Sequence, residues 1–207
     1  MRIVTVSRQF GSGGRELGKR LADRLGWDYY DREIIDALAQ DHGYDPDFIK
    51  QSLANHGWRN IQLTYRNSFS HWLYDPGQRM EIQLREREIL RSIAAVGNDC
   101  VIIGRDADVI LEEFHPFRIF VCADMQARIE RCLRHEKNRP EENRLSEKQI
   151  LRNIRRIDKN RANTREILTG KARTDSSTFD LTINTTGWEI HRLTAALAEF
   201  VLHRFEE

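Results

Sequence analysis

Short hydrophobic runs alternate with amphipathic patterns of helical period along most of this chain. The runs typical of strands span residues 3–7, 28–30, 101–104, 117–123 and 179–184. Three of them are continuously hydrophobic, as parallel strands covered on both faces are. Helical patterns span residues 15–25, 32–40, 80–96, 125–135, 146–163 and 189–205. The alternation predicts an α/β fold with a doubly wound parallel sheet, and such sheets bind ligands at the carboxyl ends of their strands.

Two segments interrupt this alternation. Residues 43–79 carry several aromatic side chains among polar ones, which predicts a helical insertion with a small hydrophobic cluster of its own. The insertion is either a surface helical pair or a flap that binds substrate. Residues 136–175 are polar and rich in arginine, and Pro140 breaks any long helix there. This second segment is either a solvated charged surface or a mobile lid over phosphates.

The distribution of charge narrows the classes of partner. The 207 residues are enough for one domain, and their net charge is +1. Residues 128–173 hold fifteen Lys or Arg against seven Asp or Glu, so the remainder of the chain is acidic. A basic block in a nearly neutral protein favours a specific anionic ligand over general coating of nucleic acid. Aromatic residues are also sparse in this block, so we expect no nucleic-acid partner.

Cysteine and histidine usage gives no sign of a metal site or a disulfide framework. Cys100, Cys122 and Cys132 lack Cys-x-x-Cys spacing, and the seven histidines are scattered. The first hydrophobic run is interrupted too early for a signal peptide, and no run approaches the roughly 20 residues that cross a bilayer. The sequence therefore predicts a cytoplasmic protein without membrane contact.

The first predicted strand runs into a glycine-rich segment, Gly-Ser-Gly-Gly at residues 11–14, and a helical pattern follows at once. Glycines let main-chain N–H groups converge on an anion, and the N-terminus of the helix adds partial positive charge. The alternative is a plain turn between a strand and a helix. The strand before and the helix after favour a phosphate-binding loop.

The side chains of this loop depart from the usual P-loop pattern, which places Lys and then Ser or Thr right after the last glycine. Gly14, Arg15 and Glu16 stand in this region instead. We expect Arg15 to supply the missing charge, because a guanidinium binds phosphate oxygens bidentately. Glu16 either holds magnesium or is an ordinary acid in the first turn of a helix.

Other charged residues follow the predicted strands or lie in the basic block. Gly104-Arg105-Asp106 comes directly after the third strand. It is either a ligand-binding group or a structural Arg–Asp pair at a helix start. Arg128, Arg131 and Arg134 share one helical face, which either embraces a nucleoside triphosphate or is a wet basic surface. Asp158 and Arg161 lie one helical turn apart, where an exposed pair contributes only about 0.3–0.5 kcal/mol.

These segments resemble the cytidylate kinase-like family of P-loop nucleoside monophosphate kinases. The resemblance lies in residues 7–16 (SRQFGSGGRE), 30–31 (YD), 103–106 (IGRD), 120–123 (FVCA, with Arg128 after it), 158–161 (DKNR) and 180–185 (DLTINT). It is good over residues 1–42 and 90–205 and poor over residues 43–80.

The resemblance implies one P-loop kinase-like domain over residues 1–207, with a five-stranded parallel sheet, an acceptor-binding insertion at 43–79 and an Arg-rich lid at 136–175. It implies ATP and Mg²⁺, with the γ-phosphoryl group moved to a CMP-like nucleoside monophosphate. The residues implied at the ATP phosphates are Gly11, Ser12, Gly13, Gly14, Arg15 and Glu16. Those implied on the acceptor side are Asp31, Arg105, Asp106 and Asp158, the last on the ribose. The catalytic candidates are Arg15 and the lid arginines Arg128 and Arg161.

Departures from the family pattern keep three functions open. Cytidylate kinases proper have Lys, a small residue and Thr where Gly14, Arg15 and Glu16 stand, and Ser where Arg32 stands. The first hypothesis is a kinase, with a CMP-like nucleotide as acceptor. The second is a nucleotide-binding module without turnover, and the third is a kinase for another small acceptor. We expect a monomer or a homodimer.

Overall fold

The computed structural model describes residues 1–31, 34–35, 76–104, 106–170 and 176–206. Five strands form one sheet: β1 (Ile3–Arg8), β2 (Asp28–Tyr30), β3 (Cys100–Ile103), β4 (Phe117–Cys122) and β5 (Leu181–Asn184). Their order across the sheet is β2-β3-β1-β4-β5, and every pairing is parallel. The predicted five-stranded, doubly wound parallel sheet is therefore confirmed, with strand ends shifted by at most two residues.

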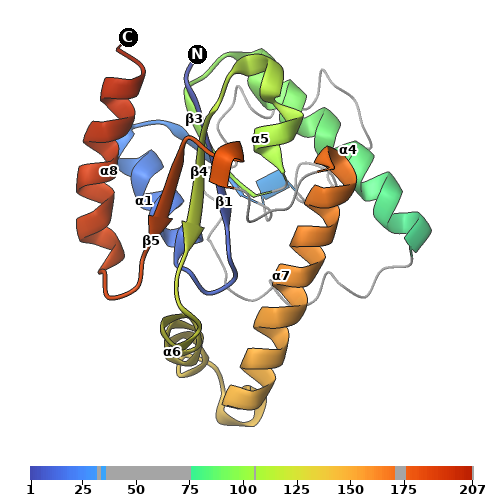
Figure 1. Cartoon of the computed structure of the whole chain (residues 1–207), viewed down its shortest axis with the longest axis vertical. Helices are drawn as coiled ribbons and strands as arrows, with labels where there is room; N and C mark the ends of the chain where they lie inside the picture. The colour runs from blue at the N-terminus through green and yellow to red at the C-terminus, as the bar shows by residue number, and fades with distance from the viewer. Residues whose placement is uncertain (32–33, 36–75, 105, 171–175, 207) are drawn as a thin grey trace.

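Helices cover both faces of the sheet, as continuously hydrophobic strands require (Figure 1). The helices described are α1 (Gly14–Leu25), α4 (Pro76–Val96), α5 (Ala107–Ile110), α6 (Met125–Glu136), α7 (Glu147–Thr169) and α8 (Ile190–Arg204). Helices α1 and α8 lie on one face, and α4, α5 and the upper part of α7 lie on the other. The sequence pattern did not predict α5, because four residues are too few to show a helical period.

The core is centred on β1, the middle strand. Ile3, Val4 and Val6 of this strand are at most 1% exposed, because both faces of the sheet are covered. Helix α1 crosses the sheet closely at Gly18, where a Cβ atom would overlap the side chain of Ile103 on β3. A glycine at this position therefore determines how near α1, and the loop that precedes it, lies to the sheet.

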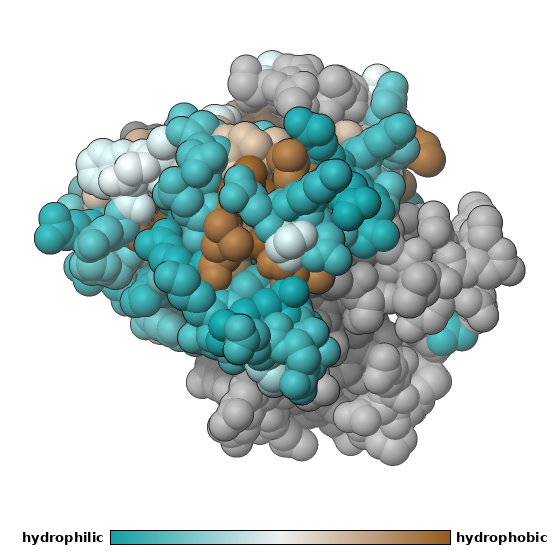
Figure 2. All heavy atoms as spheres, turned by 90° about the horizontal axis from the view of Figure 1, so that it is seen from below, coloured by the Kyte–Doolittle hydropathy of each residue, from teal (hydrophilic) through white to brown (hydrophobic). Residues whose placement is uncertain are grey.

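Helices α6 and α7 extend beyond the carboxyl ends of the strands (Figure 1). They pack on each other through Ile129, Ile150 and Ile154, and Phe10 of the glycine-rich loop packs against this cluster. Figure 2 views the molecule from this end and shows hydrophilic side chains around a smaller hydrophobic area. The two helices thus lie where a doubly wound sheet binds its ligands.

The structure describes different shares of the two segments that interrupt the alternation, residues 43–79 and 136–175. Residues 43–75 of the predicted insertion lie outside the described residues, and 76–79 form the start of α4. In the predicted lid, α7 runs to Thr169, six residues beyond its predicted end, and begins with a capping box between Ser146 and Gln149. None of the described helices is both long and hydrophobic enough to span a membrane.

The packing of α1 on the sheet can be tested at Leu21, whose side chain is fully buried. We expect Leu21→Ala to lower the free energy of unfolding by about 2–5 kcal/mol, because it leaves a cavity in the core. Urea denaturation measures this loss. Leu84→Ala is the control, because Leu84 on α4 is 57% exposed, and we expect a change below about 0.5 kcal/mol there. Equal losses in the two variants would contradict the packing described here.

Candidate phosphate-binding site

The glycine-rich loop joins the carboxyl end of β1 to the N-terminus of α1. Gly11 and Gly13 have φ angles of 78° and 80°, in the left-handed region that favours glycine. Gly13 is also the N-cap of α1, and a Cβ atom on it would lie 2.7 Å from Cδ1 of Ile190. The loop therefore needs glycine at these two positions for both backbone conformation and space.

Side chains from α6, α7 and the end of β5 bind the main-chain carbonyl groups of this loop. Arg161 donates to the carbonyl oxygen of Arg8 (3.1 Å), Arg128 to that of Phe10 (2.7 Å), and Thr185 to that of Ser12 (2.7 Å). Arg131 contributes as well, because it donates to the carbonyl of Thr185 (2.6 Å). The carbonyl side of the loop is thus held at successive points by other parts of the chain.

This anchoring orients the N–H groups of the loop. The described residues contain no cis peptide bond, and in a trans peptide the C=O and the following N–H point in opposite directions. The N–H groups of Gly11 and Gly13 therefore point away from Arg128 and Thr185, which bind the carbonyls of the same peptides. None of the described residues accepts a hydrogen bond from either N–H. Two such amides beside a helix N-terminus can bind an oxyanion.

Ser12 serves this loop through its own hydroxyl group. The side chain is buried, and its hydroxyl donates to the carbonyl of Gln9 at 2.9 Å. The side-chain oxygen of Gln9 in turn accepts from the N–H of Ala123, after β4, at 3.1 Å. Ser12 and Gln9 therefore fix the first half of the loop against the neighbouring strand.

Arg15 and Asp31, predicted on the donor and acceptor sides respectively, are in direct contact. Arg15 Nε lies 2.7 Å and Nη2 lies 2.5 Å from Oδ2 of Asp31, and Asp31 is 1% exposed. The hydroxyl of Tyr29 donates to the same oxygen at 3.2 Å. Burial, reinforced by the charge of Asp31, raises the pKa of Tyr29 far above its usual value, so this phenol stays protonated.

Glu16 does not fill the loop. Its carboxylate binds Arg20 one turn further along α1, at 2.8 Å, and its side chain is 37% exposed. In the part of the chain that the structure describes, no group of three Asp, Glu, His or Cys side chains is close enough to hold a metal ion. Mg²⁺ keeps several waters and often takes only one or two carboxylates from a protein. Glu16, the acidic residue nearest the loop in sequence, therefore remains the candidate to bind it.

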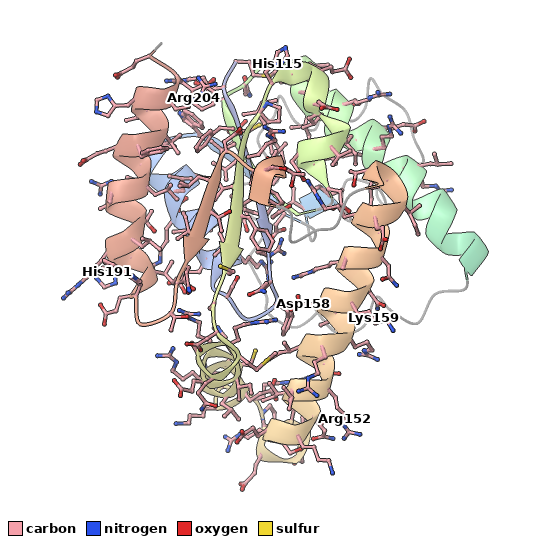
Figure 3. The ribbon with its side chains drawn as sticks, in the orientation of Figure 1. His115, Arg152, Asp158, Lys159, His191 and Arg204 are labelled. Atoms are coloured by element: carbon pink, nitrogen blue, oxygen red, sulfur yellow. The ribbon has the colours of Figure 1, made fainter. Side chains whose placement is uncertain are left out.

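Asp158 and the two predicted lid arginines lie together at the loop. One carboxylate oxygen of Asp158 accepts from the N–H of Phe10 at 2.8 Å, and the other binds the buried guanidinium of Arg128. Arg161 lies 3.9 Å from Asp158 and 5.8 Å from the centre of the Phe10 ring. Figure 3 shows Asp158 on the side of α7 that faces the strand ends, whereas Lys159 points away. The three residues thus hold the loop in place.

The segment after β3 is described only in part. Arg105 lies outside the described residues. Asp106 has a φ of 49° and is the residue before α5. Its carboxylate lies 3.9 Å from Arg165, which binds Asp108 at 2.6 Å in a fully buried pair. This pair joins α7 to α5, the short helix that follows β3.

The contacts of several residues at this site were not predicted: Arg131 was named only as one of three arginines on a helical face, and Thr185 only within the segment 180–185. Thr185, Arg131, Asp108 and Arg165 act through main-chain or buried carboxylate contacts that no residue pattern specifies. Two signals were present: Thr185 follows the last predicted strand, and Arg165 lies one turn beyond Arg161 on the same helix. Burial, and to a lesser degree the charge of Arg134, lowers the pKa of Arg131, in keeping with its position against the loop.

The sequence matches the cytidylate kinase-like family over residues 3–187. This chain belongs to the cytidylate kinase-like family. The glycine-rich loop, the strand order and the arginine-bearing helices described above all lie within the matched range. No curated protein matches the chain in sequence.

Solved structures share the fold of this family member. An uncharacterized protein from Eubacterium ventriosum is 21% identical, with a TM-score of 0.70 over 97% of this chain and 98% of that one. Shikimate kinase from Bacteroides thetaiotaomicron is 14% identical, with a TM-score of 0.54 over 97% and 98%. Shikimate kinase from Acinetobacter baumannii, in complex with shikimate, is 15% identical, with a TM-score of 0.51 over 99% and 94%. The fold is therefore that of P-loop kinases.

The anchoring of the loop can be tested at Thr185. We expect Thr185→Val to destabilise the protein by about 1–3 kcal/mol, because the carbonyl of Ser12 loses its buried donor. We also expect weaker binding of ATP, followed by calorimetry, because the N–H of Gly13 is no longer held. Thr185→Ser keeps the hydroxyl and should bind ATP normally. Thr182→Val, at an exposed position on β5 shortly before Thr185, is the control. Equal effects of the two valine variants would argue against the anchoring role.

Proposed function

We propose that this protein transfers the γ-phosphoryl group of ATP to a nucleoside monophosphate, with CMP or a similar pyrimidine nucleotide as acceptor. The observation that carries the proposal is the glycine-rich loop, whose N–H groups at Gly11 and Gly13 are directed away from its anchored carbonyls. Membership of the cytidylate kinase-like family supports the same conclusion.

On the donor side, the main-chain N–H groups of residues 11–16 bind the ATP phosphates in this proposal. The partial positive charge of α1 adds to their effect, because its first turn lies directly behind the loop. Arg128 and Arg161 approach the loop from α6 and α7. They keep the loop rigid, and Arg161, whose side chain is less buried than that of Arg128, is the one of the two that meets the transferred group in this proposal.

On the acceptor side, the proposal uses residues at the ends of β2 and β3. Asp31 follows β2 and Asp106 follows the end of β3, so both lie at the carboxyl edge of the sheet, beside the glycine-rich loop. Arg105 comes directly before Asp106 in the sequence. Arg15 belongs to both sides, because its N–H lies in the first turn of α1 while its guanidinium binds Asp31. We infer that Asp158 becomes available to the acceptor ribose only if it leaves the N–H of Phe10.

Phosphoryl transfer requires side chains mainly to position the two nucleotides and to neutralise charge. An ionised phosphate oxygen of the acceptor forms a new P–O bond as the bond between the γ-phosphorus and the ADP oxygen breaks. The electron pair stays on ADP, and no proton has to be removed from such an acceptor. Bound magnesium would neutralise charge on the phosphates. The residues of this chain orient the two nucleotides, exclude water and stabilise the equatorial oxygens.

Two alternatives make distinct predictions. A nucleotide-binding module without turnover is favoured by the absence of Lys at residues 14–16. It would bind ATP and release no ADP with any acceptor. A kinase for another small acceptor is suggested by the shared fold with shikimate kinases, although 14–15% identity supports the fold alone.

An acceptor screen tests the function directly. ADP release is followed with ATP and Mg²⁺ against CMP, dCMP, UMP, AMP and shikimate, with a no-acceptor reaction as the baseline. We expect turnover with CMP or dCMP well above that baseline. Turnover with shikimate alone would support the third hypothesis. Silence with every acceptor, from folded protein that binds ATP, would leave the binding module.

A variant of the lid tests the role of Arg161. We expect Arg161→Met to lower kcat by about 10³-fold, as loss of an arginine at a transferred phosphoryl group does. Arg152→Met is the matched control, because Arg152 is exposed on the same helix (Figure 3). Circular dichroism and thermal unfolding of both variants separate catalysis from folding. An equal kcat in Arg161→Met and the wild type would remove Arg161 from the catalytic group.

A further inference from the structure

The usual P-loop has a lysine that binds the phosphates, and this chain has Gly14 at that position. Another side chain would have to supply the positive charge of that lysine. We propose that Arg8, the last residue of β1, supplies this charge to the transferred phosphoryl group. The inference rests on the proposed function and adds a residue to the same site. It differs from the expectation that Arg15 replaces the lysine.

Sequence positions suggest an exchange between two ends of the loop. The P-loop pattern G-x-x-x-x-G-K places a glycine six residues before the lysine. If Gly13 is the last glycine of that pattern, the lysine position is Gly14 and the first glycine position is Arg8. The chain thus has glycine where the pattern has the cation, and a cation where the pattern has glycine.

Packing explains why these two differences occur together. A Cβ atom on Gly14 would lie 2.8 Å from Cβ and 3.1 Å from Cδ of Arg8. Real Cβ atoms are not found so close to the base of another side chain, which cannot swing aside as a flexible tip can. The stem of Arg8 therefore covers the first residue of α1, where a lysine side chain would begin. Only glycine fits at position 14 while arginine is present at position 8.

The guanidinium of Arg8 extends from there toward the acceptor side. Its Nη1 would lie 2.6 Å from a Cβ atom on Gly104, the residue after β3. The charge of Arg8 also acts on Tyr29, the middle residue of β2. Arg8 thus spans the distance from the phosphate loop to the ends of β2 and β3, between the proposed sites of ATP and acceptor. A phosphoryl group in transfer passes through this region.

Arg15 is less suited to this role because of its partner. Two of its nitrogen atoms lie 2.5–2.7 Å from Oδ2 of Asp31, and that carboxylate is 1% exposed. Moving Arg15 to a phosphate would leave a buried carboxylate without its cation, which is strongly unfavourable. The backbone of Arg8 is held at the site by Arg161, which donates to its carbonyl at 3.1 Å.

The chemical role follows from the geometry of a guanidinium. As the bond from the γ-phosphorus to ADP breaks and the bond to the acceptor oxygen forms, negative charge spreads over the equatorial oxygens. Arg8 donates hydrogen bonds to these oxygens and keeps all its protons throughout. Because its N–H groups form a planar fork, Arg8 can bind two oxygens at once, which a lysine ammonium does less specifically.

The first test compares three arginines in the full-length protein, with the best acceptor from the screen. We expect Arg8→Met to lower kcat by about 10³-fold, and Arg15→Met to raise mainly the KM of the acceptor. Arg24→Met on the exposed last turn of α1 is the control and should leave kcat unchanged. A kcat in Arg8→Met within about threefold of the wild type would overturn the proposal.

The second test distinguishes charge from packing. Arg8→Lys should recover at least about a tenth of the wild-type kcat, because it keeps the cation. Arg8→Gly combined with Gly14→Lys restores the usual P-loop order and should exceed Arg8→Gly alone by at least about tenfold. Gly14→Lys alone should lower kcat, because the new side chain meets Arg8. Loss in Arg8→Met with no recovery in Arg8→Lys or in the exchanged pair would assign Arg8 to structure and overturn the proposal.

Calorimetry with ATP separates this inference from the proposed function. If the wild type binds ATP but turns over no acceptor, the proposed function fails. In that case a loss of about tenfold or more in ATP affinity in Arg8→Met still supports Arg8 at the phosphates. An unchanged affinity there overturns the inference, and a wild type that binds no nucleotide overturns both.

Discussion

Hydrogen bonds from arginine and threonine side chains to the carbonyl groups of a single loop are the interaction on which the candidate site depends. A glycine-rich loop has little conformational preference of its own, because glycine loses more backbone freedom on folding than any other residue. Arg128 and Thr185 restrict it by binding the carbonyls of Phe10 and Ser12. Because C=O and N–H groups alternate along the chain, fixing the carbonyls also fixes the N–H groups, which point away from Arg128 and Thr185.

These contacts show what several arginines of the basic block, residues 128–173, do in the structure. Its arginines are not a uniform surface for polyanions, since several of them are used inside the molecule. Arg128 and Arg165 are at most 4% exposed and bind Asp158 and Asp108 respectively. Arginines such as Arg152 point to solvent instead (Figure 3). One helix, α7, thus carries both a structural face toward the sheet and a hydrated face, and net charge alone does not distinguish them.

The sheet could be predicted from the sequence because its strands obey a simple rule. A run such as residues 101–103 is hydrophobic throughout, and burial on both faces leaves few other interpretations. Of the candidate site, the sequence predicted the glycine-rich turn, and the family resemblance added Arg128, Asp158 and Arg161, which the structure brings together at the loop. Which residue Arg15 binds, and where the side chain of Arg8 extends, depend on which strands are neighbours in the sheet. The neighbouring strands β1 and β3 are nearly one hundred residues apart in the chain. Local pattern contains no information on such contacts, so the sequence alone gives Arg8 no role beside the glycines of the loop.

The bond between Thr185 and Ser12 joins residues that are 173 positions apart in the chain. During synthesis the ribosome releases Ser12 early and Thr185 among the last residues of the sheet, and a loop closed over so long a separation forms late. The glycine-rich loop therefore cannot gain this contact in a chain whose β5 has not yet been made. Under the proposed function, a nascent chain would not bind ATP until β5 has joined the sheet, and binding of the nucleotide would report a completed fold.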